Sequence, residues 1–275
     1  MLLLLALLPP ASGQVPVAAM LTDLQGRATI TQGGRSVPAT ILAEVMVGAQ
    51  LQLQADSAMV LLVLDSGVEY LVKGPAQIVM RQRLPEALSG VPPVPRATAL
   101  GPSIRVKPVG LGQGAVVMRS LAANNRIRLL SANGTVLLDR QPELRWQEPQ
   151  GGLRYVVELA DDTGRILHEH QVDGTAMTVP ADPPLKDGQT YTWAVSTRLP
   201  DGRKYASTGE FSIAGTELRA QAIALAAAAG TDLSWRVTYG AWLEQAGLKD
   251  AARKLWRVLA AERPEDGGLK ALAAR

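Results

Sequence analysis

Apolar and polar residues alternate in short runs over the first third of the chain, and Gly and Asp separate these runs. Leucines alternate with glutamines over 50–53, and residues 59–64 are all apolar. Gly33-Gly34 lies between two of the runs, and Asp65-Ser66-Gly67 lies between two others, a spacing typical of β-hairpins. Because the 59–64 run has no polar position, we expect a central strand that is buried on both faces. Residues 21–80 are therefore predicted to form a β-rich domain.

The order of glycines, leucines and turns in this stretch resembles the FecR-like domain, a β-rich module of bacterial cell envelopes. The matching features, in chain order, are Gly26 after the first strand, Gly48 before the alternating Leu51 and Leu53, Asp56-Ser57-Ala58, the leucine-rich strand and the Asp65-Ser66-Gly67 turn. The family is known for sensing and partner contact. The resemblance therefore implies a non-enzymatic role in the envelope and brings no catalytic residue with it.

Residues 81–128 are rich in proline and glycine, which disfavour helices and central strands. We expect a linker over 85–103 and edge strands at Ser103–Lys107 and Ala115–Met118. The segment holds eight basic residues and one acidic residue, a net charge of +7 in a chain of net charge +3. It is either a solvated linker, a surface that docks on the acidic 129–215 segment, or a site for an external polyanion. The candidate polyanion-binding residues are Arg81, Arg83, Arg105 and Lys107.

Short strands separated by turn residues return over 138–214 and predict an antiparallel sandwich. This stretch resembles a fibronectin type III domain. Trp146 stands at the family's early core position, and Phe211 stands at its last-strand aromatic. Leu185 and Tyr191 match the family's tyrosine corner, so the resemblance implies a hydrogen bond between the Tyr191 hydroxyl and upstream backbone. Such a sandwich usually serves as a spacer or a binding surface.

The hydrophobic period changes from two residues to 3.6 over 216–275, which indicates helices. One helix is expected to end at Ala229, a second to follow a cap at Thr231 or Asp232, and a third to end before Pro264. The fold class predicted for the whole chain is therefore mainly β with an all-α C-terminal end.

The last helices resemble a single tetratricopeptide repeat. Gly240 and Leu243 match the small and large positions of its first helix, and Ala252 and Trp256 match the alanine and aromatic of its second helix. One repeat cannot bury its own faces, so neighbouring helices or a partner must cover it. The resemblance implies a groove for a peptide or helix. The candidate residues are Arg236, Tyr239, Trp242 and Leu243, whose alternative role is to fill the helical core.

Residues 1–13 are interpreted as a signal peptide, because an apolar run over 2–8 is followed by prolines and small residues. Seven apolar residues cannot span a bilayer, which needs roughly 20. No transmembrane segment is expected, and a periplasmic or secreted location is predicted. The chain has no Cys, which excludes a disulfide framework and thiol catalysis.

Catalytic and cofactor motifs are not found. His168 and His170 flank Glu169, and a spacing of two on a strand places both imidazoles on one face. They could bind a metal or sense pH, but no third ligand is near in sequence, and a solvent-facing strand is the simpler interpretation. No nucleophile motif accompanies them. We therefore expect neither an enzyme nor a cofactor or resident metal.

The sequence favours a non-enzymatic envelope protein that acts as a protein-interaction scaffold or sensor-side component, with another envelope protein as its partner. The alternative is a module that binds the cell wall or an anionic polysaccharide through the basic 81–128 stretch. A metal-assisted enzyme at the two histidines is a third hypothesis. Nucleic acid is not expected, because no aromatic residues interleave with the basic ones.

Overall fold

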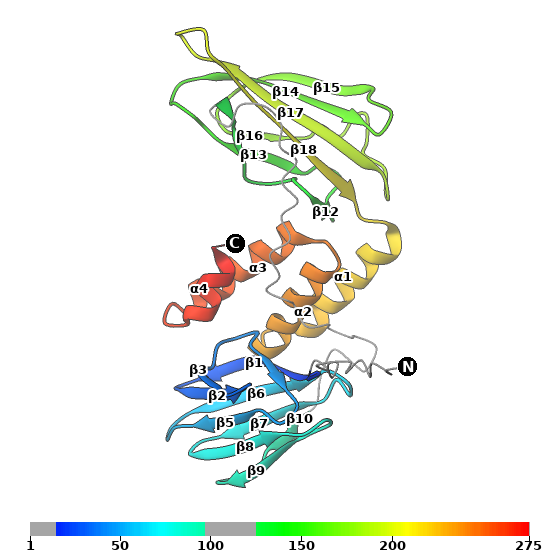
Figure 1. Cartoon of the computed structure of the whole chain (residues 1–275). Helices are drawn as coiled ribbons and strands as arrows, with labels where there is room; N and C mark the ends of the chain where they lie inside the picture. The colour runs from blue at the N-terminus through cyan, green and yellow to red at the C-terminus, as the bar shows by residue number, and fades with distance from the viewer. Residues whose placement is uncertain (1–14, 97–124, 275) are drawn as a thin grey trace, which may run out of the picture. The chain divides into compact units, whose positions relative to one another are not determined.

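The computed structural model describes residues 15–96 and 125–274 (Figure 1). The chain divides into two compact units, Met1–Pro108 and Val109–Arg275. Among the described residues, the regular structure of the first unit consists of strands, and that of the second unit is divided evenly between strands and the helices that follow its last strand. The predicted fold class, mainly β with an all-α C-terminal end, is therefore confirmed.

The first unit is built from two five-stranded antiparallel sheets. One has the order β10-β7-β6-β1-β4 and the other has the order β3-β2-β5-β8-β9. The strands are β1 (Val17–Gln25), β2 (Ala28–Gln32), β3 (Arg35–Pro38), β4 (Glu44–Met46), β5 (Gln50–Leu53), β6 (Ala58–Val63), β7 (Glu69–Lys73), β8 (Ala76–Met80), β9 (Pro85–Ser89) and β10 (Val94–Arg96).

The two sheets share one hydrophobic core. Leu21 and Leu61 from the first sheet and Leu51 and Ile78 from the second belong to the same buried cluster. Strand β6 lies in the middle of its sheet, and every residue from Met59 to Val63 is buried. The prediction of a central strand buried on both faces is confirmed.

Two strands lie where the sequence predicts a linker. Strand β9 pairs with β8 and β10 pairs with β7, each at the edge of a sheet. An edge strand tolerates proline because the N–H groups of its outer side need no partner in the sheet, and Pro85 and Pro95 stand in these strands. Residues 85–96 therefore belong to the sheets of the first unit. The strands predicted at 103–107 and 115–118 lie outside the described residues.

The second unit opens with a β-sandwich. Its larger sheet has the order β12-β18-β17-β14-β15, and the smaller has the order β11-β13-β16. The strands are β11 (Arg128–Leu129), β12 (Thr135–Leu137), β13 (Glu143–Gln147), β14 (Arg154–Asp161), β15 (Ile166–Asp173), β16 (Ala176–Thr178), β17 (Thr190–Arg198) and β18 (Lys204–Ile213).

Aromatic side chains fill the core of the sandwich. Trp146, Trp193, Tyr191 and Phe211 are each at most 1% exposed. The Tyr191 hydroxyl accepts a hydrogen bond of 2.8 Å from the backbone N–H of Lys186. This contact is the one that the leucine-then-tyrosine pattern implied, and it ties the start of β17 to the turn before it.

Four helices complete the second unit: α1 (Thr216–Ala229), α2 (Leu233–Gln245), α3 (Lys249–Glu262) and α4 (Gly267–Ala273). The Asp232 side chain caps α2 by accepting a hydrogen bond from Trp235 N. Helices α2 and α3 pack closely at Gly240, because a Cβ there would overlap the Trp256 indole. Within the described residues, no helix is long and apolar enough to cross a membrane.

The helices dock on the sandwich through the segment around β12. The Gly247 carbonyl accepts from Val136 N at 2.8 Å and from the Thr135 hydroxyl at 3.2 Å. Asp250 Oδ2 accepts from Ala132 N at 2.8 Å, and the Ala132 carbonyl accepts from Trp193 Nε1 at 2.7 Å. The backbone N–H and carbonyl of one residue, Ala132, therefore connect the aromatic core of the sandwich to the first turn of α3.

Candidate functional site

The candidate partner-binding residues on α2 are mostly enclosed. Leu243 is 1% exposed and Trp242 is 8% exposed. Tyr239 stacks on Trp242 with the ring centroids 6.0 Å apart, and burial raises the pKa of the Tyr239 phenol. Arg236 forms a two-point ion pair with Glu262 of α3, with distances of 2.6 and 3.0 Å. The structure brings the four residues together on one helix, but their side chains are engaged with neighbouring helices and with each other.

The candidate polyanion-binding residues divide between described and undescribed parts of the chain. Arg81 donates to Glu86 at 2.6 Å, and Arg83 lies 3.9 Å from Asp65, all of them exposed side chains of the first unit. Arg105 and Lys107 lie outside the described residues. The two described arginines thus already have carboxylate neighbours, although exposed pairs of this kind contribute little energy.

The two histidines differ in their surroundings. His168 is only 6% exposed and its Nε2 atom has no hydrogen-bond partner among the described residues, whereas His170 is exposed. The interpretation of both as residues of a solvent-facing strand is therefore wrong for His168. Both histidines lie opposite core residues of β14, His168 opposite Leu159 and His170 opposite Val157, but only the His168 side chain is buried. In the described part of the chain, no group of three or more His, Asp or Glu is arranged to hold a metal ion.

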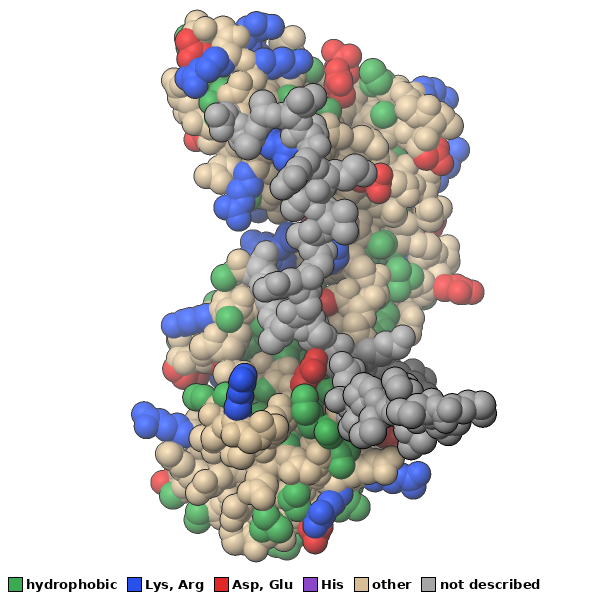
Figure 2. All heavy atoms as spheres, viewed as in Figure 1, with side chains coloured by type: hydrophobic (Ala, Val, Ile, Leu, Met, Phe, Trp, Pro, Cys, Tyr) green, Lys and Arg blue, Asp and Glu red, His purple; other side chains and the backbone are tan. Residues whose placement is uncertain are grey.

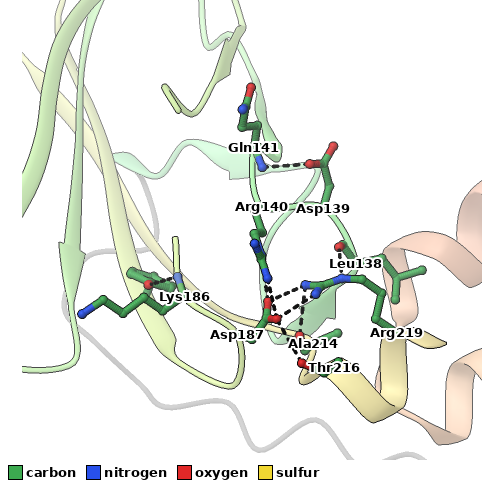
Figure 3. Close-up of polar contacts among 10 residues, drawn as sticks. Leu138, Asp139, Arg140, Gln141, Lys186, Asp187, Ala214, Thr216 and Arg219 are labelled. Atoms are coloured by element: carbon green, nitrogen blue, oxygen red, sulfur yellow. Dashed lines mark hydrogen bonds and ion pairs between the residues drawn. The ribbon is translucent and has the colours of Figure 1, made fainter. Parts of the chain in front are cut away.

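A cluster of charged side chains holds α1 against the sandwich (Figure 3). Arg219 of α1 donates to both carboxylate oxygens of Asp187, at 2.7 and 2.9 Å, and to the Leu138 carbonyl at 3.0 Å. Arg140 donates to the same carboxylate at 2.6 and 2.9 Å. Hydrogen bonds from Arg219 and then Arg140 hold the pKa of Asp187 well below its usual range. We assign this cluster a structural role, because the carboxylate is already occupied by two guanidinium groups.

A cleft of about 300 Å³ lies between the small sheet of the sandwich and the last helices. It is lined by four arginines, Arg128, Arg145, Arg253 and Arg257, and a single carboxylate, Asp250, while Ala273 and Ala274 lie at the end of α4. All of these residues belong to the second unit. We call this site the arginine cleft.

The sandwich wall of the arginine cleft is set by strand pairing. Arg128 of β11 lies opposite Gln147 of β13, and Leu130 N donates to the Arg145 carbonyl at 2.8 Å. Arg128 and Arg145 are therefore diagonal neighbours on one face of the strand pair. The opposite face carries Leu129 and Trp146, which pack in or against the sandwich core. The alternation of the strands thus directs both arginines away from the core.

The helical wall is provided by α3. Arg253 and Arg257 are one helical turn apart and so share a face of the helix. Arg253 donates to Asp250 Oδ1 at 2.9 Å and to the Leu130 carbonyl at 3.4 Å, which places its guanidinium between the two walls. Asp250 uses its other oxygen for Ala132 N. The one acidic group of the cleft is therefore buried and occupied.

The arginine cleft has an excess of three positive charges, from four guanidinium groups and one carboxylate. The side chains of Arg128 and Arg257 are exposed, and their guanidinium groups have no hydrogen bond or ion pair within the described residues. Arg145 lies 3.9 Å from Glu143, a distance too long for a hydrogen bond, and both side chains are half exposed. Two guanidinium groups thus have no described partner, and that of Arg145 can bind an anion by leaving its long, exposed ion pair with Glu143. Figure 2 shows Lys and Arg side chains over both units on the face in view.

Sequence reasoning named none of the four arginines of this site as a candidate binding residue. Arg128 ends the basic 81–128 stretch, but the other three arginines lie in segments where acidic residues balance the charge. The spacing of Arg253 and Arg257 on a predicted helix is a usable signal for a basic helical face. Their meeting with Arg128 depends on contacts across more than 100 residues, such as Ala132 with Asp250.

Comparison with known proteins adds little. No protein-family model matches the chain, and no curated protein matches it in sequence. Among solved structures, CopC from Methylosinus trichosporium OB3b is similar at 19% identity and a TM-score of 0.26, over 33% of this chain and 95% of CopC. A likeness of that size carries no argument about fold or function. The resemblances to FecR-like, fibronectin type III and tetratricopeptide modules stay predictions.

Proposed function

We propose that this protein is a non-enzymatic binding protein of the bacterial envelope, and that it holds a negatively charged partner in the arginine cleft. The observation that carries the proposal is a cleft with two unpaired guanidinium groups and a third in a long, exposed ion pair, whose only carboxylate among the described residues is already bound. Arginine is well suited to this role because its planar group stays charged and binds oxyanions with two parallel hydrogen bonds.

The proposal favours an anionic glycan or wall polymer over a protein partner on α2. The side chains expected to line a groove there are engaged: Leu243 and Trp242 are buried, and Arg236 is paired with Glu262. The envelope location rests on the FecR-like resemblance and on the interpretation of residues 1–13, so it is part of the proposal. Fractionation of cells that express the full chain tests it directly.

Sedimentation with purified cell-wall sacculi, repeated at rising salt, tests the binding function. The wild-type chain is expected to sediment with the wall at low salt and to be released as salt screens the charges. Replacing Arg128, Arg145 and Arg257 together by Ser should abolish this binding. The control replaces Arg154, Arg165 and Arg203 by Ser, which removes the same charge from side chains that do not line the cleft.

Three results would count against the proposal. Equal sedimentation of the two triple variants would show that the cleft is not the binding site. Loss of binding only when Arg81 and Arg83 are replaced by Ser would assign the role to the first unit. In-cell crosslinking that recovers one envelope protein equally well with the cleft variant would favour the protein-scaffold function instead.

A further inference from the structure

The arginine cleft is lined by guanidinium groups from two different walls. Arg128 and Arg145 come from the sandwich wall, and Arg257 comes from α3. A ligand that satisfies all three must offer acceptor oxygens on more than one side. The arrangement of the guanidinium groups therefore restricts the chemistry of the ligand, in addition to requiring that the ligand be negatively charged.

We infer that the ligand of the arginine cleft carries a phosphoryl group, as a pyrophosphate or a phosphate ester, and that this group contacts both walls. The inference rests on the proposed anion-binding function. A carboxylate has two oxygens in one plane and can accept two-point hydrogen bonds from two guanidinium groups, as Asp187 does from Arg140 and Arg219, but it has no third oxygen for another guanidinium group. A phosphoryl group has three outer oxygens in a tetrahedral arrangement, so it can accept from guanidinium groups that approach from different sides.

The walls of the arginine cleft are held in place before any ligand binds. Asp250 joins them by accepting from Ala132 N of the sandwich and from Arg253 of the helix. The Gly247 carbonyl adds two further hydrogen bonds to the segment at β12. Because these contacts fix the spacing of the walls, little ordering is needed when an anion binds, which favours affinity.

The size and lining of the cleft agree with a small polar group. A volume of about 300 Å³ holds a phosphoryl group together with part of the molecule that carries it. No aromatic side chain lines the cleft, so a stacked base or sugar ring has no platform among the described residues. Recognition must therefore come from charge and hydrogen bonds.

Calorimetric titration of the full chain with pyrophosphate and with citrate tests the inference. The two anions have the same net charge near neutral pH, but one offers phosphoryl oxygens and the other carboxylates. Pyrophosphate is expected to bind about tenfold more tightly or better. The variants Arg128→Ala and Arg257→Ala should each weaken pyrophosphate binding by about tenfold or more. Lys254→Ala, an exposed neighbour on α3 that does not line the cleft, is the matched control and should bind as wild type.

The double variant Arg128→Ala/Arg257→Ala tests whether one phosphoryl group bridges the walls. If it does, the double variant should lose less than the product of the two single losses, because either single loss already breaks the bridge. A soluble glycerol-phosphate polymer, titrated alongside, distinguishes a polymer phosphodiester from a free pyrophosphate as the source of the group.

The outcomes of these titrations distinguish failure of the phosphoryl inference from failure of the proposed anion-binding function. Equal affinities for pyrophosphate and citrate, both lost in the arginine variants, would overturn the phosphoryl inference and leave anion binding at the arginine cleft in place. Binding of pyrophosphate that survives Arg257→Ala would also overturn it, because the helical wall would then take no part. If pyrophosphate, citrate and the glycerol-phosphate polymer all fail to bind, both the phosphoryl inference and the proposed anion-binding function are overturned.

Discussion

Asp250 is predicted to be the residue that couples the helices to the sandwich. Its side chain is largely buried, and Oδ2 accepts from Ala132 N at 2.8 Å. The substitution Asp250→Ala removes the acceptor and leaves a buried N–H without a partner, because Ala132 is only 1% exposed. An unsatisfied buried donor costs about 1–3 kcal/mol. The lost contact with Arg253 adds little, since that guanidinium is partly exposed.

We therefore expect Asp250→Ala to lower the free energy of unfolding by about 2 kcal/mol. For a unit of this size, that corresponds to a fall in Tm of roughly 4–8 °C. Denaturant unfolding followed by tryptophan fluorescence measures the change. Hydrogen exchange of the Ala132 amide measures the loss of stability at the site of the broken hydrogen bond. This amide should exchange about thirtyfold faster in the variant.

Two control variants sharpen the Asp250 experiment. Asp250→Asn keeps an oxygen that can accept from Ala132 N, so it should recover at least half of the loss. Asp201→Ala removes an exposed aspartate whose ion pair with Arg203 lies at the surface, and it should change stability by less than about 0.5 kcal/mol. The reasoning would be refuted if Asp250→Ala matched this surface control and left the protection of the Ala132 amide unchanged.

Three further predictions concern the second unit. Gly240→Ala should destabilise this unit by about 1–3 kcal/mol, because the new methyl group overlaps the Trp256 indole. This loss should exceed the gain from the higher helix propensity of Ala. Denaturant unfolding measures the change, and an unchanged or raised stability would contradict this packing. Tyr191→Phe should cost about 1 kcal/mol, measured in the same way, through loss of the hydrogen bond from Lys186 N, whereas wild-type stability would show that the hydroxyl contributes nothing. Because its folded-state pKa is lowered, Asp187 should stabilise the unit above the ordinary aspartate pKa of about 3.9 and lose this contribution as pH falls below it. Thermal unfolding across acidic pH should therefore show a steeper loss for wild type than for Asp187→Asn, and parallel curves would refute the assignment.

Local features of the fold follow from the sequence because they depend on neighbouring residues. The apolar run at 59–64 predicts β6, and the change of period predicts α1 at its observed end, Ala229. Asp232 caps α2 as its type and position indicate. In each case the physical cause acts within a few residues, so the pattern alone is sufficient.

Long-range features could not be read from the sequence in the same way. The docking of α3 on the sandwich depends on a hydrogen bond between Ala132 and Asp250, which are 118 residues apart. No local pattern distinguishes Asp250 from any other aspartate in the first turn of a helix, where a negative charge is favourable in any case. The edge strands β9 and β10 were obscured by their prolines, which exclude a central strand but not an edge.

The candidate site depends on these long-range contacts. The count of basic residues over 81–128 points to Arg81 and Arg83, yet among the described residues of that stretch only Arg128 lines the arginine cleft. Arg145 and Arg257 reach it through strand pairing and through the docked helix. Charge patterning along the sequence therefore selects other arginines than those that the structure brings together in the cleft.

The most direct test of the account is a hydrogen-exchange footprint of the full chain with and without the anionic wall polymer. Binding in the arginine cleft predicts slower exchange over residues 128–131, 143–147 and 250–257, which form its two walls. The same footprint should be absent in the Arg128, Arg145 and Arg257 triple Ser variant. Protection confined to the first unit, or to α2 around Trp242, would contradict the central claim that the arginine cleft is the binding site.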